Sequence, residues 1–248
     1  MKAMILAAGL GTRLRPLTDD RPKALVTVAG RTLLEIALAR LRVSGVREVI
    51  VNVHHYAEMI ADYLKAHENF GMSIELSREE QLLDTGGGLK KAAHFFSGSK
   101  EPFILHNVDV ISAIDLSRMM RFHAEKNPLA TLAVQERESS RQLLFDEKGR
   151  LCGRRVGRDA EVEFVRSSAE TQALAFSGIH ILSPQIFAKM EEEGAFSIID
   201  VYLRLAAQGE KIIAFRADDC YWRDLGRPEN ILQAERDLSS GEFVVSQA

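Results

Sequence analysis

The chain has few cysteines, no excess of basic residues and no long apolar run, and each shortage excludes a class of protein. Its two cysteines, Cys152 and Cys220, lie far apart and lack metal-ligand spacing, so neither a disulfide scaffold nor a zinc site is expected. The formal net charge of -3 argues against a nucleic-acid partner. No stretch approaches the ~20 apolar residues of a membrane span. We therefore expect a cytoplasmic protein without nucleic-acid or membrane partners.

The composition is that of a globular protein. Hydrophobic residues make up 46% of the 248 residues and charged residues 27%, which is typical of a domain with a large core. No linker or low-complexity segment divides the chain. We therefore expect a single domain over residues 1–248, in which residues 239–248 form a frayed tail.

In the first half, short apolar runs alternate with amphipathic stretches. This order predicts a Rossmann-like, doubly wound α/β fold with a mainly parallel sheet, in which ligands bind at the carboxyl ends of the strands. Strands are expected at 3–8, 48–53, 72–76 and 102–107, and helices at 32–44, 56–67, 86–96 and 115–126.

The second half is richer in strands and predicts a smaller β-rich lobe on the same mixed sheet. An Asp-Glu-Lys-Gly turn at residues 146–149 indicates a hairpin. Strands are expected at 130–135, 143–145, 150–156, 173–182 and 211–216, and helices at 183–193, 197–208 and 228–238.

The segment after the first expected strand carries the chemistry of a phosphate site. Gly9 and Gly11 let backbone amides approach a ligand, and Arg13 and Lys23 add positive charge that suits a triphosphate or pyrophosphate. The loop is not a Walker loop. It is not a dinucleotide fingerprint either, because Leu14 stands where a third glycine is required. An NAD(P)-dependent oxidoreductase is therefore disfavoured.

The run LAAGLGTRLRPLT at residues 6–18, then Pro22-Lys23 and an apolar run ending at Gly30, resembles the N-terminus of the sugar-1-phosphate nucleotidyltransferases. The likeness is to the short bacterial N-acetylmuramate-1-phosphate uridylyltransferases and mannose-1-phosphate guanylyltransferase-like enzymes. The resemblance implies a glycosyltransferase-A-like fold, with residues 1–128 as the nucleotide-binding part and 129–238 as the acceptor-binding part. It also implies that a nucleoside triphosphate and a sugar 1-phosphate react to give a nucleoside-diphosphate sugar and pyrophosphate.

Two aspartates that follow apolar or aromatic runs are the candidate metal ligands. Asp109 ends the run LHNVDV at 105–110, and Asp224 lies in YWRDLG at 221–226, which is similar to the family's W-x-D-x-G element. Carboxylates of this kind suit Mg²⁺, and the resemblance implies Mg²⁺ as the cofactor. Val108 stands where the family usually has glycine, so we expect added bulk beside the nucleotide.

Two glycine-bearing segments complete the resemblance, namely DTGGGL at 84–89 and FSGI at 176–179. The family's E-K-P acceptor motif is absent, and Arg141 is the candidate substitute. The resemblance implies catalysis by Arg13, Lys23 and Asp109, and sugar-phosphate binding by Lys23, Arg141, Ser177 and Gly178. It implies nucleotide binding by Leu6, Ala8, Gly9, Gly11, Thr12, Arg13, Gln81, Thr85, Gly86, Gly87 and Asn107.

Two alternatives stay open. A phosphocholine-type cytidylyltransferase would use the same N-terminal loop with another acceptor. A catalytically silent regulatory module of the same fold should lack Lys23, Asp109 or Asp224, and all three are present. The base, the sugar and the oligomeric state are not readable from the sequence.

Overall fold

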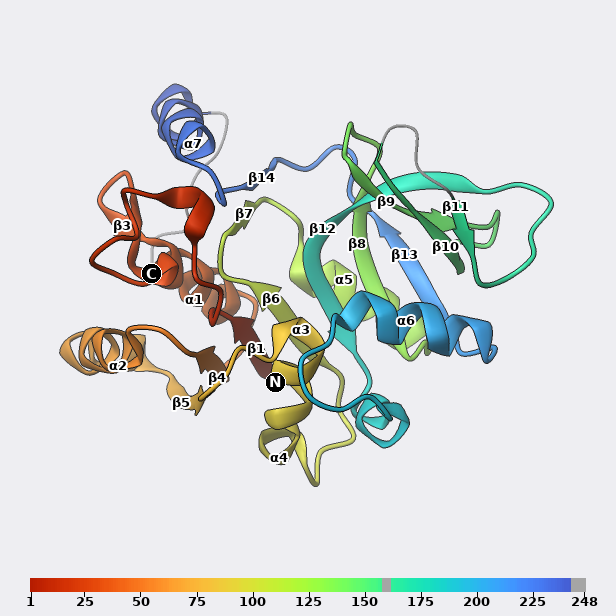
Figure 1. Ribbon diagram of the computed structural model, residues 1–248, viewed down its shortest axis with the longest axis horizontal. Helices are drawn as coiled ribbons and strands as arrows, with labels where there is room; N and C mark the ends of the chain where they lie inside the picture. Colours follow the sequence, from red (N-terminus) through yellow and green to blue (C-terminus); the bar gives the residue numbers. More distant parts are fainter. Residues whose placement is uncertain (158–161, 242–248) are drawn as a thin grey trace.

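The structure is a computed structural model that describes residues 1–157 and 162–241. Its centre is a block of four parallel strands (Figure 1). The three inner strands of the block are short, rich in apolar residues and mostly buried, as expected for strands covered on both faces, whereas the outermost strand is mostly exposed or half-buried. Their order is β6 (Phe103–Asn107), β1 (Lys2–Leu6), β4 (Glu48–Val53) and β5 (Ser73–Arg78).

Helices cover both faces of this block, which confirms the predicted doubly wound α/β fold. Along β1, Ala3 and Ile5 belong to a core cluster shared with the first helices, whereas Met4 belongs to a second cluster on the other face. The alternation follows from the two-residue period of a strand. The helices of the first half are α1 (Leu33–Val43), α2 (Ala57–Ala66), α3 (Asp84–Lys91), α4 (Ala93–Phe96) and α5 (Leu116–Lys126).

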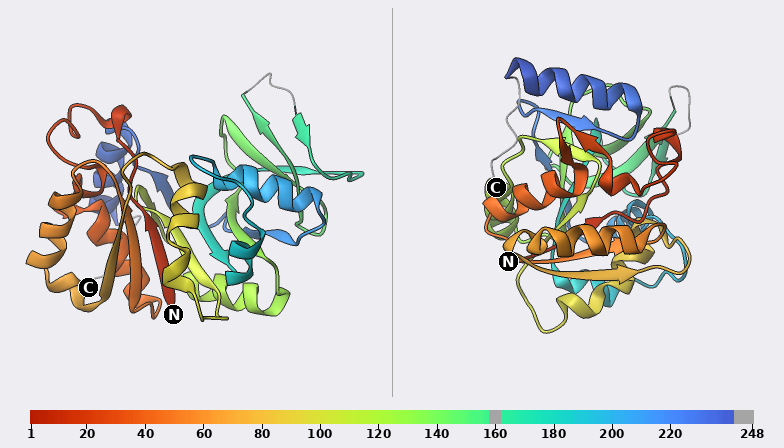
Figure 2. Two further views of the ribbon diagram at one scale, coloured as in Figure 1. Left: turned by 60° about the horizontal axis from the view of Figure 1, so that its bottom comes forward. Right: turned by 90° about the vertical axis from the view of Figure 1, so that its left-hand side faces the viewer.

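The second half extends the sheet with antiparallel pairs. The long strand β12 (Gln172–Leu182) runs antiparallel to β6 and to β8 (Ala130–Gln135), and β13 (Ile212–Arg216) is parallel to β8. A hairpin beyond β12 forms the β-rich lobe, which projects away from the parallel block (Figure 2). Its strands are β9 (Arg141–Phe145), β10 (Leu151–Val156) and β11 (Val162–Phe164).

The C-terminal helix returns to the N-terminal half. α7 (Pro228–Ser240) lies beside the first loops (Figure 1), and the Ala29 amide donates to Glu235 Oε1 on this helix at 3.2 Å. The second lobe is covered instead by α6 (Ile198–Ala207). No helix within the described ranges is long and apolar enough to cross a membrane.

Several elements of two to four residues escaped the sequence patterns, because so few residues cannot display a period. The most consequential is a two-stranded ribbon of β7 (Val110–Ser112) and β14 (Trp222–Asp224). The others are β2 (Thr27–Val28), β3 (Arg31–Thr32) and the 3₁₀ turns at Thr12–Leu14, Lys23–Leu25 and Glu68–Gly71.

Two expected helices were wrong in extent. The helix expected at 86–96 begins earlier, at Asp84, and breaks into α3 and α4. The helix expected at 183–193 is a 3₁₀ segment, Pro184–Lys189. There, Arg204 Nη2 donates to the Lys189 carbonyl at 2.8 Å. In a longer α-helix, this carbonyl would instead accept from the backbone amide four residues later.

The expected tail was also partly wrong. Ser239 and Ser240 belong to α7, and Gly241 ends the helix in the left-handed conformation at φ 79°. The remaining residues of the expected tail, 242–248, lie outside the described residues.

Three buried histidines make the fold sensitive to acid. Burial lowers the pKa of His106 and of His123 to about 4, and that of His180 to about 3. His123 is satisfied as a neutral ring, since its Nδ1 lies 2.9 Å from Thr131 Oγ1 and its Nε2 lies 3.1 Å from Ser183 Oγ. Charging any of these rings means placing an ion in the core.

We therefore predict that stability is complete above pH ~6.5, the ordinary histidine pKa, and falls as the pH drops toward 4. Between pH 7 and 5 each ring should remove on the order of 2 kcal/mol from the free energy of unfolding. Urea unfolding at several pH values measures this slope. His123→Gln should flatten it, and the exposed control His55→Gln should not. An unchanged slope in His123→Gln would contradict the assignment.

Candidate active site

An ion pair between two loops marks the centre of the site. Lys23 Nζ lies 2.6 Å from Asp109 Oδ2, and their side chains are only 15% and 11% exposed. Lys23 opens the 3₁₀ turn Lys23–Leu25, and Asp109 follows β6. The two residues are 86 positions apart, so the parallel sheet brings them together. Both were candidate catalytic residues, and their role in catalysis stays a prediction.

The β7–β14 ribbon brings the second aspartate to the same place. Asp224 is paired with Val110, directly after Asp109, and the Leu225 amide donates to the Asp109 carbonyl at 2.8 Å. Asp224 Oδ1 accepts from the Gly226 amide at 2.6 Å. Within the described residues, each carboxylate therefore keeps its second oxygen without a hydrogen-bond partner.

The two aspartates fit a hard cation that takes few protein ligands. Within the described ranges, no cluster of three or more histidine, cysteine or acidic side chains is arranged to hold a metal. Mg²⁺ does not need such a cage, because it binds through one or two carboxylates together with water and substrate phosphates. The expected ligands Asp109 and Asp224 match this donor set, although Mg²⁺ binding itself stays a prediction.

The glycine-rich loop passes directly over Lys23. Gly11 adopts φ 65°, and a Cβ there would lie 3.1 Å from Lys23 Cβ and 3.0 Å from Thr18 Cγ2. Thr18 Oγ1 holds the loop by donating to the Gly11 carbonyl at 2.9 Å. Gly9 and Thr12 are at the surface and Ala8 is buried. The loop therefore needs glycine at position 11 for both its conformation and its close packing.

Arg13 lies at the other side of the loop, beside Asp224. A Cβ built on Gly226 would come within 2.8 Å of both Arg13 Nη2 and Asp224 Oδ1. Arg13 is exposed and lies outside ion-pair distance of any acid among the described residues. Each predicted cation thus lies beside one of the two aspartates, Lys23 beside Asp109 and Arg13 beside Asp224.

Two buried polar residues that the sequence interpretation missed hold the loop in place. Asn52 Oδ1 accepts from the Ala7 amide at 2.7 Å, and Asn52 Nδ2 donates to Glu79 Oε1 at 2.8 Å. Glu79 Oε2 in turn accepts from the Leu83 amide at 3.0 Å. A polar residue inside the apolar strand VIVNV was the available signal, because a buried amide must find partners.

The glycine triplet has a packing function that the sequence did not indicate. The amides of Gly86 and Gly87 donate to the Phe196 carbonyl at 2.9 and 3.3 Å. A Cβ on Gly86 would lie 2.4 Å from the Phe196 ring, and one on Gly87 would lie 2.4 Å from the Gly194 carbonyl oxygen. Thr85 Oγ1 accepts from the Ile198 amide at 3.0 Å. The triplet therefore packs α3 against the segment leading into α6, and the nucleotide binding predicted for Gly86 and Gly87 stays a prediction.

Gly178 places β12 against the site. The register of β12 and β8 shifts between Phe176 and His180, and Gly178 lies in this bulge at φ 73°. A Cβ there would lie 2.8 Å from Val110 Cγ2 and 2.9 Å from Asn107 Nδ2. Asn107, at the end of β6, and Gly178 thus meet directly beside Asp109.

One residue lies differently from what the sequence suggested. Val108 is 1% exposed and belongs to the core, so its expected bulk in a nucleotide pocket was wrong. Gln81 is exposed in the loop before α3, and Arg141 is exposed at the first position of β9, so their predicted substrate contacts stay predictions. Leu6, by contrast, ends β1 where its carbonyl accepts from the Val108 amide at 3.1 Å.

A cavity of about 740 Å³ lies behind the glycine-rich loop, between that loop and α7. Pro16 and Leu17 line one side of it, and Ile231 and Leu232 line the other. None of the predicted site residues lines it. It is therefore separate from the Lys23–Asp109 centre.

Solved structures of other proteins are similar to this fold. The putative glucose-1-phosphate thymidylyltransferase of Bacillus anthracis has a TM-score of 0.80 at 16% identity, covering 100% of this chain and 98% of its own. HddC from Yersinia pseudotuberculosis, solved in complex with GMP-PN, has a TM-score of 0.76 at 24% identity, covering 96% and 99%. At these identities the likeness shows the fold alone, a mixed α/β fold of the nucleotidyltransferase type.

Sequence comparison defines the family. Residues 2–241 match the nucleotidyl transferase family. The N-acetylmuramate alpha-1-phosphate uridylyltransferase of Caulobacter vibrioides is 36% identical, over 96% of each chain. The UTP–glucose-1-phosphate uridylyltransferase of Synechocystis is 30% identical, over 98% of this chain and 64% of its own length. This chain belongs to the nucleotidyl transferase family.

Replacing Gly178 by alanine should reduce stability and distort the site. Its positive φ alone costs roughly 1 kcal/mol for a non-glycine residue, and the clashes with Val110 and Asn107 add about 1–3 kcal/mol. The matched control is Gly98→Ala, because Gly98 has φ 78° with nothing within 4 Å of its Cβ position. Urea unfolding should show the larger loss in Gly178→Ala. Equal losses would mean that the close contact at Gly178 is unimportant.

Proposed function

We propose that this protein transfers a nucleoside monophosphate from a nucleoside triphosphate to a sugar 1-phosphate. A phosphate oxygen of the sugar attacks the α-phosphorus, the bond from the α-phosphorus to the bridging oxygen breaks, and pyrophosphate leaves. The observation that carries the proposal is the Lys23–Asp109 ion pair beside Asp224, beneath a glycine-rich loop. Catalysis then rests on positioning and charge neutralisation rather than on a covalent intermediate.

Each charged group has a distinct task in this proposal. Lys23, partly buried and therefore little screened, attracts the α-phosphate or the acceptor phosphate. Arg13, at the exposed rim, attracts the departing pyrophosphate. Gly9 and Gly11 let backbone amides approach the phosphates. These assignments place positive charge on both sides of the reacting phosphorus.

Asp109 and Asp224 would hold Mg²⁺. Bound there, the ion would neutralise phosphate charge and orient the triphosphate. The ion pair with Lys23, at 2.6 Å, fixes the position of the Asp109 carboxylate before any cation binds. The carbonyl of Asp224 is held by Asn230 Nδ2 at 2.7 Å, which fixes the second ligand.

The first substrates to test are UTP and N-acetylmuramate 1-phosphate. The relative that matches this chain over 96% of both lengths is named as an N-acetylmuramate alpha-1-phosphate uridylyltransferase, and UTP is the corresponding uridylyl donor to test. The match to the Synechocystis enzyme, named for UTP and glucose 1-phosphate, covers only 64% of that protein. We therefore rank the uridylyl donor first and test glucose 1-phosphate second.

The test is pyrophosphate release from a matrix of UTP, GTP, dTTP, CTP and ATP against N-acetylmuramate, glucose and mannose 1-phosphates, with Mg²⁺ or with EDTA. CTP with phosphocholine is included as the competing acceptor. A Mg²⁺-dependent signal with one sugar 1-phosphate supports the proposal and names the base. A signal only with phosphocholine, or none with any pair, would overturn it.

Asp109→Asn should lower turnover by roughly 10²-fold or more, the scale of losing one preorganised electrostatic group. The reason is that a neutral amide forms no ion pair with Lys23 and binds a divalent cation more weakly than a carboxylate does. Steady-state rates at saturating Mg²⁺ measure the effect. Asp62→Asn, an exposed acid on α2, is the control and should keep full activity. Unchanged turnover in Asp109→Asn would refute the metal assignment.

A further inference from the structure

Arg137, just beyond the end of β8, is a cation beside the site that no site assignment above uses. Its guanidinium carbon lies 3.6 Å from the centre of the Trp222 ring, and its Nη2 donates to the Phe176 carbonyl at 2.9 Å. Burial lowers the pKa of Arg137 to about 10, while the charge of Asp224 opposes that shift. Arg137 therefore lies in the field of a candidate metal ligand.

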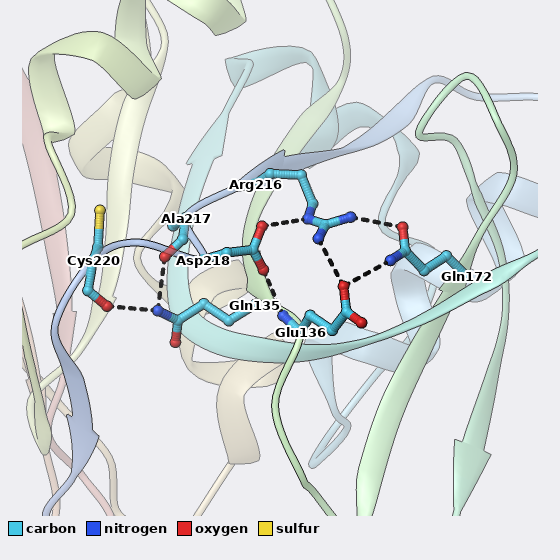
Figure 3. A network of polar contacts seen from close by, with 7 residues as sticks. All are labelled: Gln135, Glu136, Gln172, Arg216, Ala217, Asp218 and Cys220. Atoms are coloured by element: carbon cyan, nitrogen blue, oxygen red, sulfur yellow. Dashed lines mark hydrogen bonds and ion pairs between the residues drawn. The ribbon is translucent and has the colours of Figure 1, made fainter.

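A polar network fixes the backbone from which Arg137 projects (Figure 3). Gln135 Nε2 donates to two carbonyls of the loop between β13 and β14, at 2.7 and 2.8 Å. The Glu136 amide donates to Asp218 Oδ1 at 2.6 Å, and Arg216 bonds both Glu136 and Asp218. The end of β8 and the entry to β14 are thus locked together, which sets Arg137 over Trp222.

Trp222 connects this unit to the predicted sugar-binding segment. Its indole Nε1 donates to the Ser177 carbonyl at 2.7 Å, next to Gly178. Arg137 and Trp222 together therefore hold the carbonyls of Phe176 and Ser177, the two residues that precede Gly178. Arg137 consequently lies against β12 and not against the glycine-rich loop.

The charge of Arg137 is only partly compensated. No acid lies within ion-pair distance of it in the part of the chain that the structure describes, and its Nε is buried without a hydrogen-bond partner. A half-buried guanidinium is weakly screened and presents donors in a planar fork that suits phosphate or carboxylate. Arg141 differs, since it is exposed at the edge of the β-rich lobe.

We propose that Arg137 binds an anionic group of the acceptor, the task that the sequence had suggested for Arg141. This inference rests on the proposed function, because it names the residue that recognises the acceptor of that reaction. The anion is either the 1-phosphate itself or a carboxylate on the sugar. Arg137 thus acts as a specificity-determining residue opposite the triphosphate cations Arg13 and Lys23.

The main variant is Arg137→Gln, whose planar amide can still stack on Trp222 and donate to the Phe176 carbonyl. We expect its KM for the acceptor to rise about 10- to 100-fold, the usual cost of one charge-assisted contact. Its KM for the nucleoside triphosphate should stay within about twofold, because a role confined to the acceptor leaves triphosphate binding intact. Arg137→Lys keeps the positive charge without the planar guanidinium, so its acceptor KM should lie between those of the wild type and Arg137→Gln. It replaces the glutamine variant as the test if that variant does not fold.

Two arginine variants sharpen the comparison. Arg155→Ala removes an exposed arginine of β10 and should leave both KM values unchanged. Arg141→Ala tests the competing assignment. If Arg141→Ala raises the acceptor KM and neither Arg137 variant does, the inference is wrong. Equal rises in the acceptor and triphosphate KM of Arg137→Gln would show a merely structural role and would also overturn it.

Comparing two acceptors separates the two possible anions. If the acceptor KM of Arg137→Gln rises equally for glucose 1-phosphate and for N-acetylmuramate 1-phosphate, Arg137 binds the phosphate. If the KM rises only for N-acetylmuramate 1-phosphate, Arg137 binds the sugar carboxylate. Wild-type protein provides the remaining distinction. If it transfers no nucleotide to any sugar 1-phosphate, the proposed function fails, whereas an active wild type with an unaffected Arg137→Gln refutes this inference alone.

Discussion

The structure depends on holding two carboxylates, Asp109 from the middle of the sequence and Asp224 from its C-terminal part, at one edge of a sheet. Two like charges repel, so their approach requires a rigid backbone and a nearby cation. The β7–β14 ribbon supplies the backbone by pairing Asp224 with Val110. Lys23, 2.6 Å from Asp109, supplies the cation. The glycine-rich loop and the return of α7 to the N-terminal half follow from the same requirement, because Lys23 and Asp224 must both reach Asp109.

Around this centre, buried polar groups and glycines fix positions that apolar packing alone would leave loose. Asn52 and Glu79 tie the start of the glycine-rich loop to the segment before α3. Gly86 and Gly87 let α3 approach the entry to α6 closely enough for their amides to reach one carbonyl. A buried hydrogen bond has a narrow range of allowed geometries, so these links define distances between segments that the hydrophobic core fixes only broadly.

The parallel block was predictable because its information is local. Strands such as β4 are short aliphatic runs, and helices such as α1 carry the longer helical period, so the α/β class follows from periodicity. The ribbon of β7 and β14 was not predictable in the same way. Each strand has three residues, too few for a period, and their pairing depends on the rest of the fold. The extents of α3 and of Pro184–Lys189 were likewise set by contacts with α6 and its approach.

The sequence by itself determined which chemical groups are present and in which local setting. Lys23 and Asp109 were identifiable because phosphate chemistry needs cations and carboxylates near the ends of strands, and Asp224 because its surroundings resemble the W-x-D-x-G element of the family. Only the tertiary structure decided which groups meet. The Val108 side chain is in the core, and the glycine triplet packs one helix against another segment. Arg141 is at the surface, and Arg137 lies over the Trp222 ring. The physical reason is that side-chain direction and burial depend on long-range packing, which no local pattern of residues contains.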